Sequence, residues 1–186
     1  MLFRSDLHTA VNAVENKPAF GRLDGWTADR ILKGAGANVN PTEEHMNQSC
    51  KVYRTTSQSI PDSTWTAVAF DNEEWDTNNI HDNATNPNRL TCKVAGKYLV
   101  IAGLQWVGNT TGRRLLRIRQ SGATDIVEAE ATISAANPVG GSIATGIASL
   151  AVDGYLELLA YQTSGGALNT YASRLTVNFA MHRLVS

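Results

Sequence analysis

The segment that most constrains the fold is residues 89–106, which predicts a short strand, a turn at Ala95-Gly96 and a long second strand. In the second strand, apolar side chains recur at every other position, as they do on one face of a β-strand. These side chains are Tyr98, Val100, Ala102 and Leu104. A similar pair follows the turn at Asp153-Gly154, with strands at residues 155–161 and 173–184. We therefore expect long antiparallel strands, with the last strand in the middle of a sheet.

Other segments after residue 50 also read as strands. They lie at residues 50–56, 65–70, 112–122, 126–133 and 142–152. Residues 71–88 are rich in Asp and Asn and predict a long polar loop. About ten strands at this spacing are typical of an all-β antiparallel jelly-roll sandwich and not of alternating strands and helices.

Residues 1–46 differ from the rest and predict a short helix and an extended arm, followed by a β domain at 47–186. Ser5 can cap a helix over residues 6–16, and one face of that helix is apolar through Leu7, Val11 and Val14. Phe20 and Trp26 make the following segment too apolar for a disordered tail. We expect the arm to lie against a partner, with packing on its own β domain as the alternative.

Charge and hydropathy exclude several classes of partner. The chain has 16 Lys and Arg against 17 Asp and Glu, a net charge of -1, so we expect no attraction to nucleic acid or anionic lipid. The apolar runs are of strand length, so no membrane insertion is expected. Charges at Arg4 and Asp6 argue against a signal peptide, and we expect synthesis in a cytoplasm.

We expect no cofactor and no metal. Cys50 and Cys92 lack paired histidines, so zinc is not indicated, and a disulfide between them is left open. The segment 71–88 carries several carboxylates beside His81, and calcium is one interpretation of this loop. The alternative is that Asp71, Asp76 and Asp82 accept hydrogen bonds from their own backbone.

No catalytic motif is present. The chain contains neither a nucleophile elbow nor a phosphate-binding glycine loop. Glu128 and Glu130 share a strand face and could form a glycosidase pair. We expect instead that Arg117 and Arg119 pair with them across neighbouring strands, with binding of an anionic host glycan as the alternative.

Three segments together resemble one superfamily. They are residues 91–98 (Thr-Cys-Lys-Val-Ala-Gly-Lys-Tyr), 153–158 (Asp-Gly-Tyr-Leu-Glu-Leu) and 179–184 (Phe-Ala-Met-His-Arg-Leu). They resemble landmarks of the jelly roll shared by tumour necrosis factor (TNF) and the globular heads of complement. Residues 59–71, 75–82 and 34–43 are similar to versions found in tailed bacteriophages.

The resemblance implies a non-enzymatic homotrimer in a phage virion, assembled in the host cytoplasm. It is similar to a capsid decoration or head-fibre protein that the arm anchors to other virion proteins of capsid or tail. The candidate virion anchor is Leu7, Val11, Val14, Phe20 and Trp26. The residues placed in the trimer seam or the monomer core are Tyr98, Leu158, Tyr161, Phe179 and Met181.

The main alternative is a tail or baseplate tip that recognises a host surface polysaccharide, with Trp75 or Tyr171 stacking on sugar rings. A glycan hydrolase and a cytokine-like ligand are further alternatives. No collagen-like stalk or long coiled coil is present, so a short knob on a short anchor fits better than a long fibre.

Overall fold

The computed structural model describes residues 30–33, 42–45, 48–135 and 139–184. The chain divides into two compact units, Met1–Met46 and Asn47–Ser186. In the first unit, β1 (Arg30–Lys33) pairs antiparallel with β2 (Thr42–His45), in a segment where the sequence indicated little regular structure. The predicted helix at residues 6–16 and all five candidate anchor residues lie outside the described residues.

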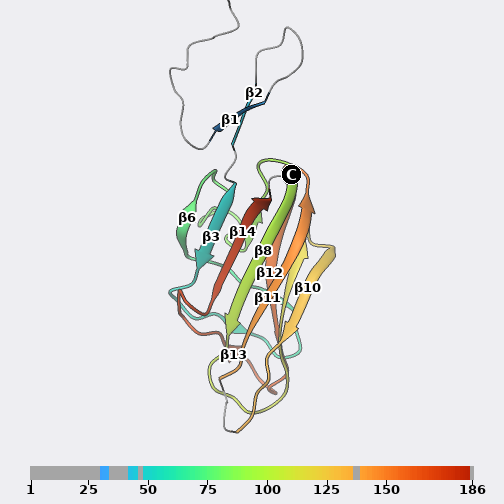
Figure 1. Cartoon of the computed structure of the whole chain (residues 1–186). Helices are drawn as coiled ribbons and strands as arrows, with labels where there is room; N and C mark the ends of the chain where they lie inside the picture. The colour runs from blue at the N-terminus through green and yellow to red at the C-terminus, as the bar shows by residue number, and fades with distance from the viewer. Residues whose placement is uncertain (1–29, 34–41, 46–47, 136–138, 185–186) are drawn as a thin grey trace, which may run out of the picture. The chain divides into compact units, whose positions relative to one another are not determined.

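The second unit is a sandwich of two antiparallel sheets (Figure 1). The front sheet has the order β11-β8-β14-β3-β6. Its strands are β11 (Gly141–Leu150), β8 (Gly96–Gln105), β14 (Asn178–Leu184), β3 (Ser49–Tyr53) and β6 (Asn72–Asp76). As predicted, the last strand, β14, lies in the middle, paired with β8 on one side and β3 on the other.

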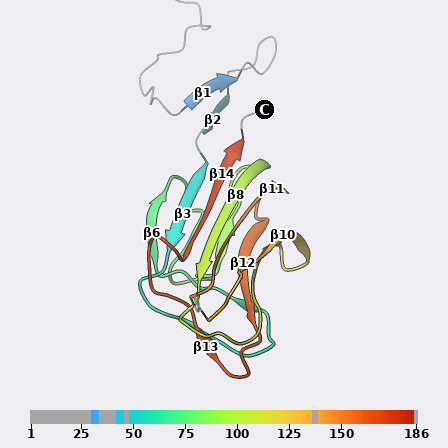
Figure 2. The same cartoon turned by 60° about the horizontal axis from the view of Figure 1, so that its bottom comes forward.

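The back sheet has the order β10-β9-β12-β5 and lies behind the front sheet in both views (Figure 2). Its strands are β10 (Thr124–Glu130), β9 (Arg114–Gln120), β12 (Tyr155–Gln162) and β5 (Thr66–Ala67), and β7 (Arg89–Thr91) also pairs with β12. A small sheet joins β13 (Leu168–Asn169) to β4 (Ser59–Ile60). The predicted all-β antiparallel jelly roll is confirmed.

The core fills the space between the two sheets with side chains from alternate positions. Tyr98, Val100, Ala102 and Leu104 are all buried, as their period-two spacing predicted. Phe70 and Phe179 meet in this core, with ring centroids 6.0 Å apart.

Two predicted segments differ from the structure. The strand expected at residues 65–70 is only the two-residue β5, because the Gln58 side chain takes over the backbone hydrogen bonds beside it. Gln58 Nε2 donates to the Ala67 carbonyl, and the Ala69 N–H donates to Gln58 Oε1. The loop expected at residues 71–88 begins with edge strand β6. The sequence pattern missed β6 because its carboxylates resemble those of a polar loop, although edge strands often carry such charges.

The carboxylates of this segment bind their own chain. Asp76 accepts hydrogen bonds from the N–H groups of Asn78 and His81, and Asp82 accepts from Ala84 and Thr85. His81 is buried, with Nδ1 3.0 Å from Glu73 Oε1 and Nε2 3.1 Å from the Pro87 carbonyl. The loop is therefore held by backbone capping, the alternative to a calcium site.

Other metal and redox features are as follows. Within the described ranges, no group of three or more His, Cys, Asp or Glu side chains is arranged to hold a metal ion. Cys50 and Cys92 are both free and buried. The described part of the chain also contains no helix long and apolar enough to cross a membrane.

The Asp71 carboxylate accepts hydrogen bonds from the segment that follows β3 and from the first residue of β6. Its ionisation should therefore make the stability of the domain depend on pH. Burial alone would raise the pKa of Asp71, but hydrogen bonds from the Thr56 hydroxyl, the Asn72 amide and two backbone N–H groups lower it well below its usual range. A lowered folded-state pKa adds stability above the unfolded-state pKa, and that stability is lost as pH falls through the folded-state value.

We therefore expect Asp71→Asn to lower the free energy of unfolding by about 1–2 kcal/mol at pH 6. The difference from wild type should shrink as the pH is lowered from 5 toward 2, because Asp71 of the unfolded wild-type chain then takes up a proton while the folded carboxylate stays ionised. Urea melts of both proteins across this range measure the difference. A difference that stays constant with pH would contradict the assigned role of the charge.

Candidate functional site

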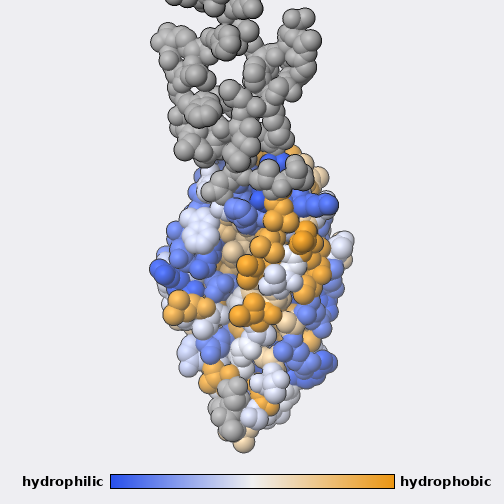
Figure 3. All heavy atoms as spheres, in the orientation of Figure 1, coloured by the Kyte–Doolittle hydropathy of each residue, from blue (hydrophilic) through white to orange (hydrophobic). Residues whose placement is uncertain are grey.

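The outward face of the front sheet carries exposed aliphatic side chains on its central strands. Ile101 is 39% exposed on β8, and Ile143 and Ile147 are 73% and 61% exposed on β11. The register places these side chains side by side, since Leu99 is opposite Ile147 and Ile101 is opposite Thr145 and Ala180. Figure 3 shows the hydrophobic residues gathered on this side of the domain. We call this surface the apolar face; it comprises Leu99, Ile101, Ile143, Thr145, Ile147 and Ala180.

The sequence of β8 explains this face. From Tyr98 to Leu104 the strand is apolar or glycine at every position, so its outward side is as apolar as its inward side. Such continuous apolar runs are typical of strands that are buried on both faces. The core covers only the inward side of β8. This two-sided pattern was the sequence signal for the face, and the prediction used only the inward half of it.

The centre of the apolar face is also uncharged. β11 contains no ionisable residue, and the outward positions of β8 from Leu99 to Gln105 contain none. Charged or titratable side chains lie at its margins, at Lys97 and His182 toward one end and at Lys51 on β3. A contiguous, neutral and apolar surface of this kind marks an interaction site more often than a solvated face.

The outward face of the back sheet is charged and carries a row of ion pairs between arginines and carboxylates. Arg113 Nε lies 2.7 Å from Glu130 Oε1, Arg119 Nε lies 2.7 Å from Asp125 Oδ1, and Arg117 Nε donates to Glu128 over 2.9 Å. The predicted pairing of Arg117 with Glu128 is confirmed. Glu130 pairs with Arg113, and not with Arg119, because antiparallel β10 carries it toward the start of β9. These ion pairs suit a surface in contact with water.

The ion pairs argue against the two alternatives for this sheet, a glycosidase pair and a site for an anionic glycan. A hydrogen bond from Arg113 lowers the pKa of Glu130, whereas a glycosidase acid needs a raised pKa. Arg113, Arg117 and Arg119 each have a carboxylate partner, which leaves this row already neutralised for an anionic glycan.

The five residues predicted for the trimer seam or the monomer core fall into two groups, four that are buried and one that is not. Tyr98, Leu158 and Phe179 are 0% exposed and Met181 is 1% exposed within a single chain, so they belong to its core and a partner subunit cannot reach them. Tyr161 lies half-buried on the outward side of the back sheet. Its ring is 5.1 Å from that of Trp65, whose other neighbour is the Arg117 guanidinium, 4.0 Å from the ring centroid.

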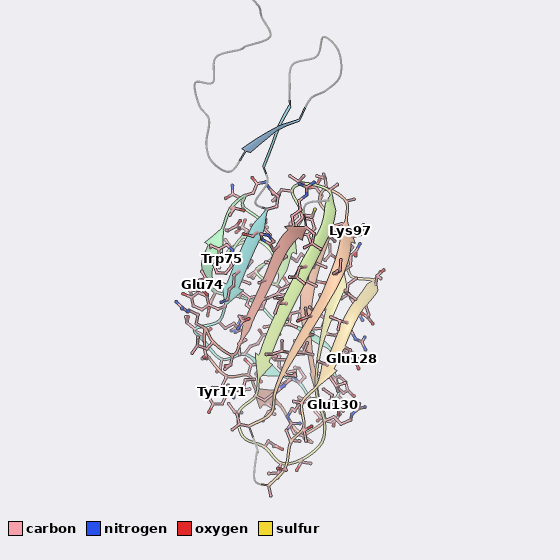
Figure 4. The ribbon with its side chains drawn as sticks, in the orientation of Figure 1. Glu74, Trp75, Lys97, Glu128, Glu130 and Tyr171 are labelled. Atoms are coloured by element: carbon pink, nitrogen blue, oxygen red, sulfur yellow. The ribbon has the colours of Figure 1, made fainter. Side chains whose placement is uncertain are left out.

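The two candidate glycan contacts are both on the surface but not together. Trp75 is 45% exposed on β6, and Tyr171 is 40% exposed in the segment after β13. Figure 4 places them well apart along the domain, so they do not form one site. Trp75 is held by a 3.1 Å hydrogen bond from its indole N–H to Ser49 Oγ, with Lys51 Nζ 5.5 Å from the ring centroid. Of the two, only Trp75 has its ring fixed by such a hydrogen bond.

Solved structures share this arrangement of strands at low sequence identity. Murine APRIL at pH 5.0 superimposes with a TM-score of 0.60 and 8% identity, covering 74% of this chain and 99% of that chain. Eiger TNF from S. frugiperda gives 0.56 and 8%, covering 76% and 95%. The globular domain of zebrafish complement 1qA protein gives 0.49 and 15%, covering 73% and 93%. No protein-family model and no curated protein sequence matches the chain.

This likeness concerns the fold. The chain has a TNF-like jelly roll, as the resemblance in its sequence implied.

Proposed function

We propose that this protein is a non-enzymatic homotrimer whose subunits meet through the apolar face. The observation that carries the proposal is the contiguous, uncharged row of exposed aliphatic side chains on β8 and β11. A second copy is the occupant we assign, because the sequence resembles a superfamily of trimeric jelly rolls. In a closed ring each face contacts a different surface of the next subunit, so no apolar face is left open to solvent.

Light scattering on the purified protein tests the trimer directly. We expect three times the chain mass of 20.1 kDa for the full-length protein, and a trimer again for a version that begins at residue 47. A monomer at micromolar concentration in both cases would refute the trimer. A trimer that is lost on truncation would instead assign assembly to residues 1–46.

We further propose that the trimer is a structural component of a tailed-phage virion, as a capsid decoration or head-fibre protein anchored by residues 1–46. The support is the sequence resemblance of residues 59–71, 75–82 and 34–43, together with the separate unit at Met1–Met46. Three weak anchors joined in one trimer bind a particle with far higher avidity than one anchor, because each later contact is intramolecular.

Deletion of residues 2–16 is expected to leave a soluble trimer that no longer decorates virus particles. The deleted segment contains the candidate anchor residues Leu7, Val11 and Val14, and none of the jelly roll. Co-sedimentation with undecorated particles measures binding, and light scattering confirms the trimer. Full decoration by the shortened protein would show that the anchor lies elsewhere.

The second candidate function is recognition of a host surface polysaccharide, which the exposed, fixed indole of Trp75 favours. Here Trp75→Ala is expected to reduce binding of the trimer to host cells by roughly tenfold or more, the usual effect of removing a central aromatic contact. Tyr171→Ala serves as the matched control, since Tyr171 is similarly exposed but lies elsewhere. Unchanged cell binding by the Trp75 variant would remove this residue from any glycan site.

A further inference from the structure

The loop between β6 and β7 contains a buried histidine, His81, whose side chain is 0% exposed. β6 is an edge strand of the front sheet (Figure 1), whereas β7 pairs with the back sheet, so this loop joins the two sheets. Its backbone is attached to the domain on both sides of this residue. The Ile80 carbonyl accepts a hydrogen bond from the Thr91 N–H, and the Pro87 carbonyl accepts one from the Phe70 N–H.

Both ring nitrogens of His81 face hydrogen-bond acceptors. Nδ1 lies 3.0 Å from Glu73 Oε1, and Nε2 lies 3.1 Å from the Pro87 carbonyl oxygen. A neutral imidazole has only one N–H, so its other nitrogen would turn a lone pair toward an oxygen lone pair. A carbonyl has no proton to give. With Glu73 ionised, only the doubly protonated ring makes both hydrogen bonds.

The surroundings of Glu73 favour its ionised form. The side-chain amide of Asn83 donates to the same Oε1 over 3.3 Å, and the Glu73 side chain is 32% exposed, so water also supports its charge. Within the described ranges, no lysine or arginine forms an ion pair with Glu73. The protonated ring of His81 therefore supplies the positive charge opposite this carboxylate.

The other ionisable groups around the ring also favour a positive charge there. Asp76 accepts a hydrogen bond from the His81 N–H over 2.8 Å, and Asp82 is the next residue in the loop. Cys50, opposite Asp76 on β3, stays neutral, because burial and then the charge of Asp76 raise the pKa of its thiol. The ring is thus surrounded by carboxylates on its own loop and on β6.

We propose that protonated His81 holds the loop at residues 77–88 in place, and that the loop loosens when the ring loses its proton as the pH rises. We call Glu73, His81 and Pro87 the proton clamp. A group that binds its proton more tightly in the folded than in the unfolded chain adds stability at low pH, and that stability is lost as the pH rises. Deprotonation replaces one of the two hydrogen bonds by a buried contact between two acceptors. The clamp lies within one subunit, so it does not depend on the proposed trimer.

Nitrogen-15 spectra of the histidine rings in the full-length protein test the protonation directly. We expect both ring nitrogens of His81 to carry a proton at pH 7. The variant His81→Gln identifies the His81 signals among those of the four histidines. An unprotonated Nδ1 or Nε2 on His81 at pH 7 would overturn the clamp, and this measurement needs no folded variant of Glu73.

Glu73→Gln tests the loosening, because a neutral amide can accept from the protonated ring or donate to the neutral one. The clamp then holds in both protonation states. Amide hydrogen exchange is compared with wild type at the same pH, at the N–H groups of His81 and Phe70. We expect the protection of these amides in wild type, relative to Glu73→Gln, to fall at least about tenfold between pH 6 and pH 9.

Glu74→Gln is the matched control for this variant. Glu74 is the next residue on β6, but its carboxylate lies 2.8 Å from Lys51 Nζ and belongs to another ion pair. Protection that falls with pH in wild type and in Glu74→Gln, but not in Glu73→Gln, supports the clamp. A ratio between wild type and Glu73→Gln that is the same at both pH values overturns the pH-dependent loosening, even with a protonated ring at pH 7.

Discussion

Replacing Phe179 by aspartate is expected to unfold the jelly roll. Phe179 is fully buried on β14, where its ring packs 6.0 Å from that of Phe70. The substitution removes that packing and leaves an unpaired carboxylate between the sheets. We expect a loss of more than about 5 kcal/mol, comparable to the whole stability of a domain. Far-ultraviolet circular dichroism and the thermal midpoint measure the change.

Ala180→Asp is the matched control for this change. Ala180 is the next residue on β14, and its side chain points outward, opposite Ile101. We expect this variant to keep the circular dichroism spectrum of the wild type, although Ala180 belongs to the apolar face and its replacement should weaken the proposed trimer. A folded Phe179→Asp protein would mean that the assigned register of β14 is wrong, because a shift of one residue exchanges the two faces of a strand.

Ile147→Lys is expected to convert the trimer into folded monomers. Ile147 is 61% exposed in the single chain, so lysine can replace it without strain in the subunit. In the trimer the same position would bury an unpaired ammonium group at each of the subunit contacts. The penalty of about 3–5 kcal/mol at each site should raise the dissociation concentration by more than a hundredfold. Light scattering and the thermal midpoint are the two measurements.

Val152→Lys provides the comparison for this variant. Val152 is also an exposed aliphatic residue, at 55%, but it lies in the turn after β11 and outside the apolar face. It should remain trimeric. A trimer of normal strength in the Ile147 variant would assign the subunit contact to another surface and leave the apolar face without its proposed role.

Much of the fold could be predicted from local sequence patterns. The turns at Ala95-Gly96 and Asp153-Gly154 and the period-two spacing in β8 located the longest strands. The length of β5 was overestimated because the side chain of Gln58 makes hydrogen bonds with the backbone of Ala67 and Ala69, where a neighbouring strand would otherwise pair. No local sequence pattern reveals such a contact. β6 was missed because its charges, suited to a sheet edge, look like those of a loop.

The candidate site was harder to predict for a different reason. Strand periodicity separates the two faces of Tyr98–Leu104 but does not say which face meets the other sheet and which meets a partner. Both faces of this segment are apolar, and the prediction rested on the inward face, which carries the aromatic ring of Tyr98. The outward face became recognisable only when the register placed Leu99 and Ile101 beside Ile147 and Thr145.

The central position of β14 has a consequence for synthesis. β14 follows every other strand in the sequence, yet it separates β8 from β3 and pairs with both. While the chain is still on the ribosome, these two strands have no neighbour on their facing edges, and unpaired edges of this kind promote aggregation. The front sheet therefore closes only after translation has passed residue 184, through pairings distant in sequence that form slowly. A chain cut short before Asn178 would keep the pairing of β8 with β11 but would lack the strand that joins β8 to β3, so the front sheet could not form as a whole.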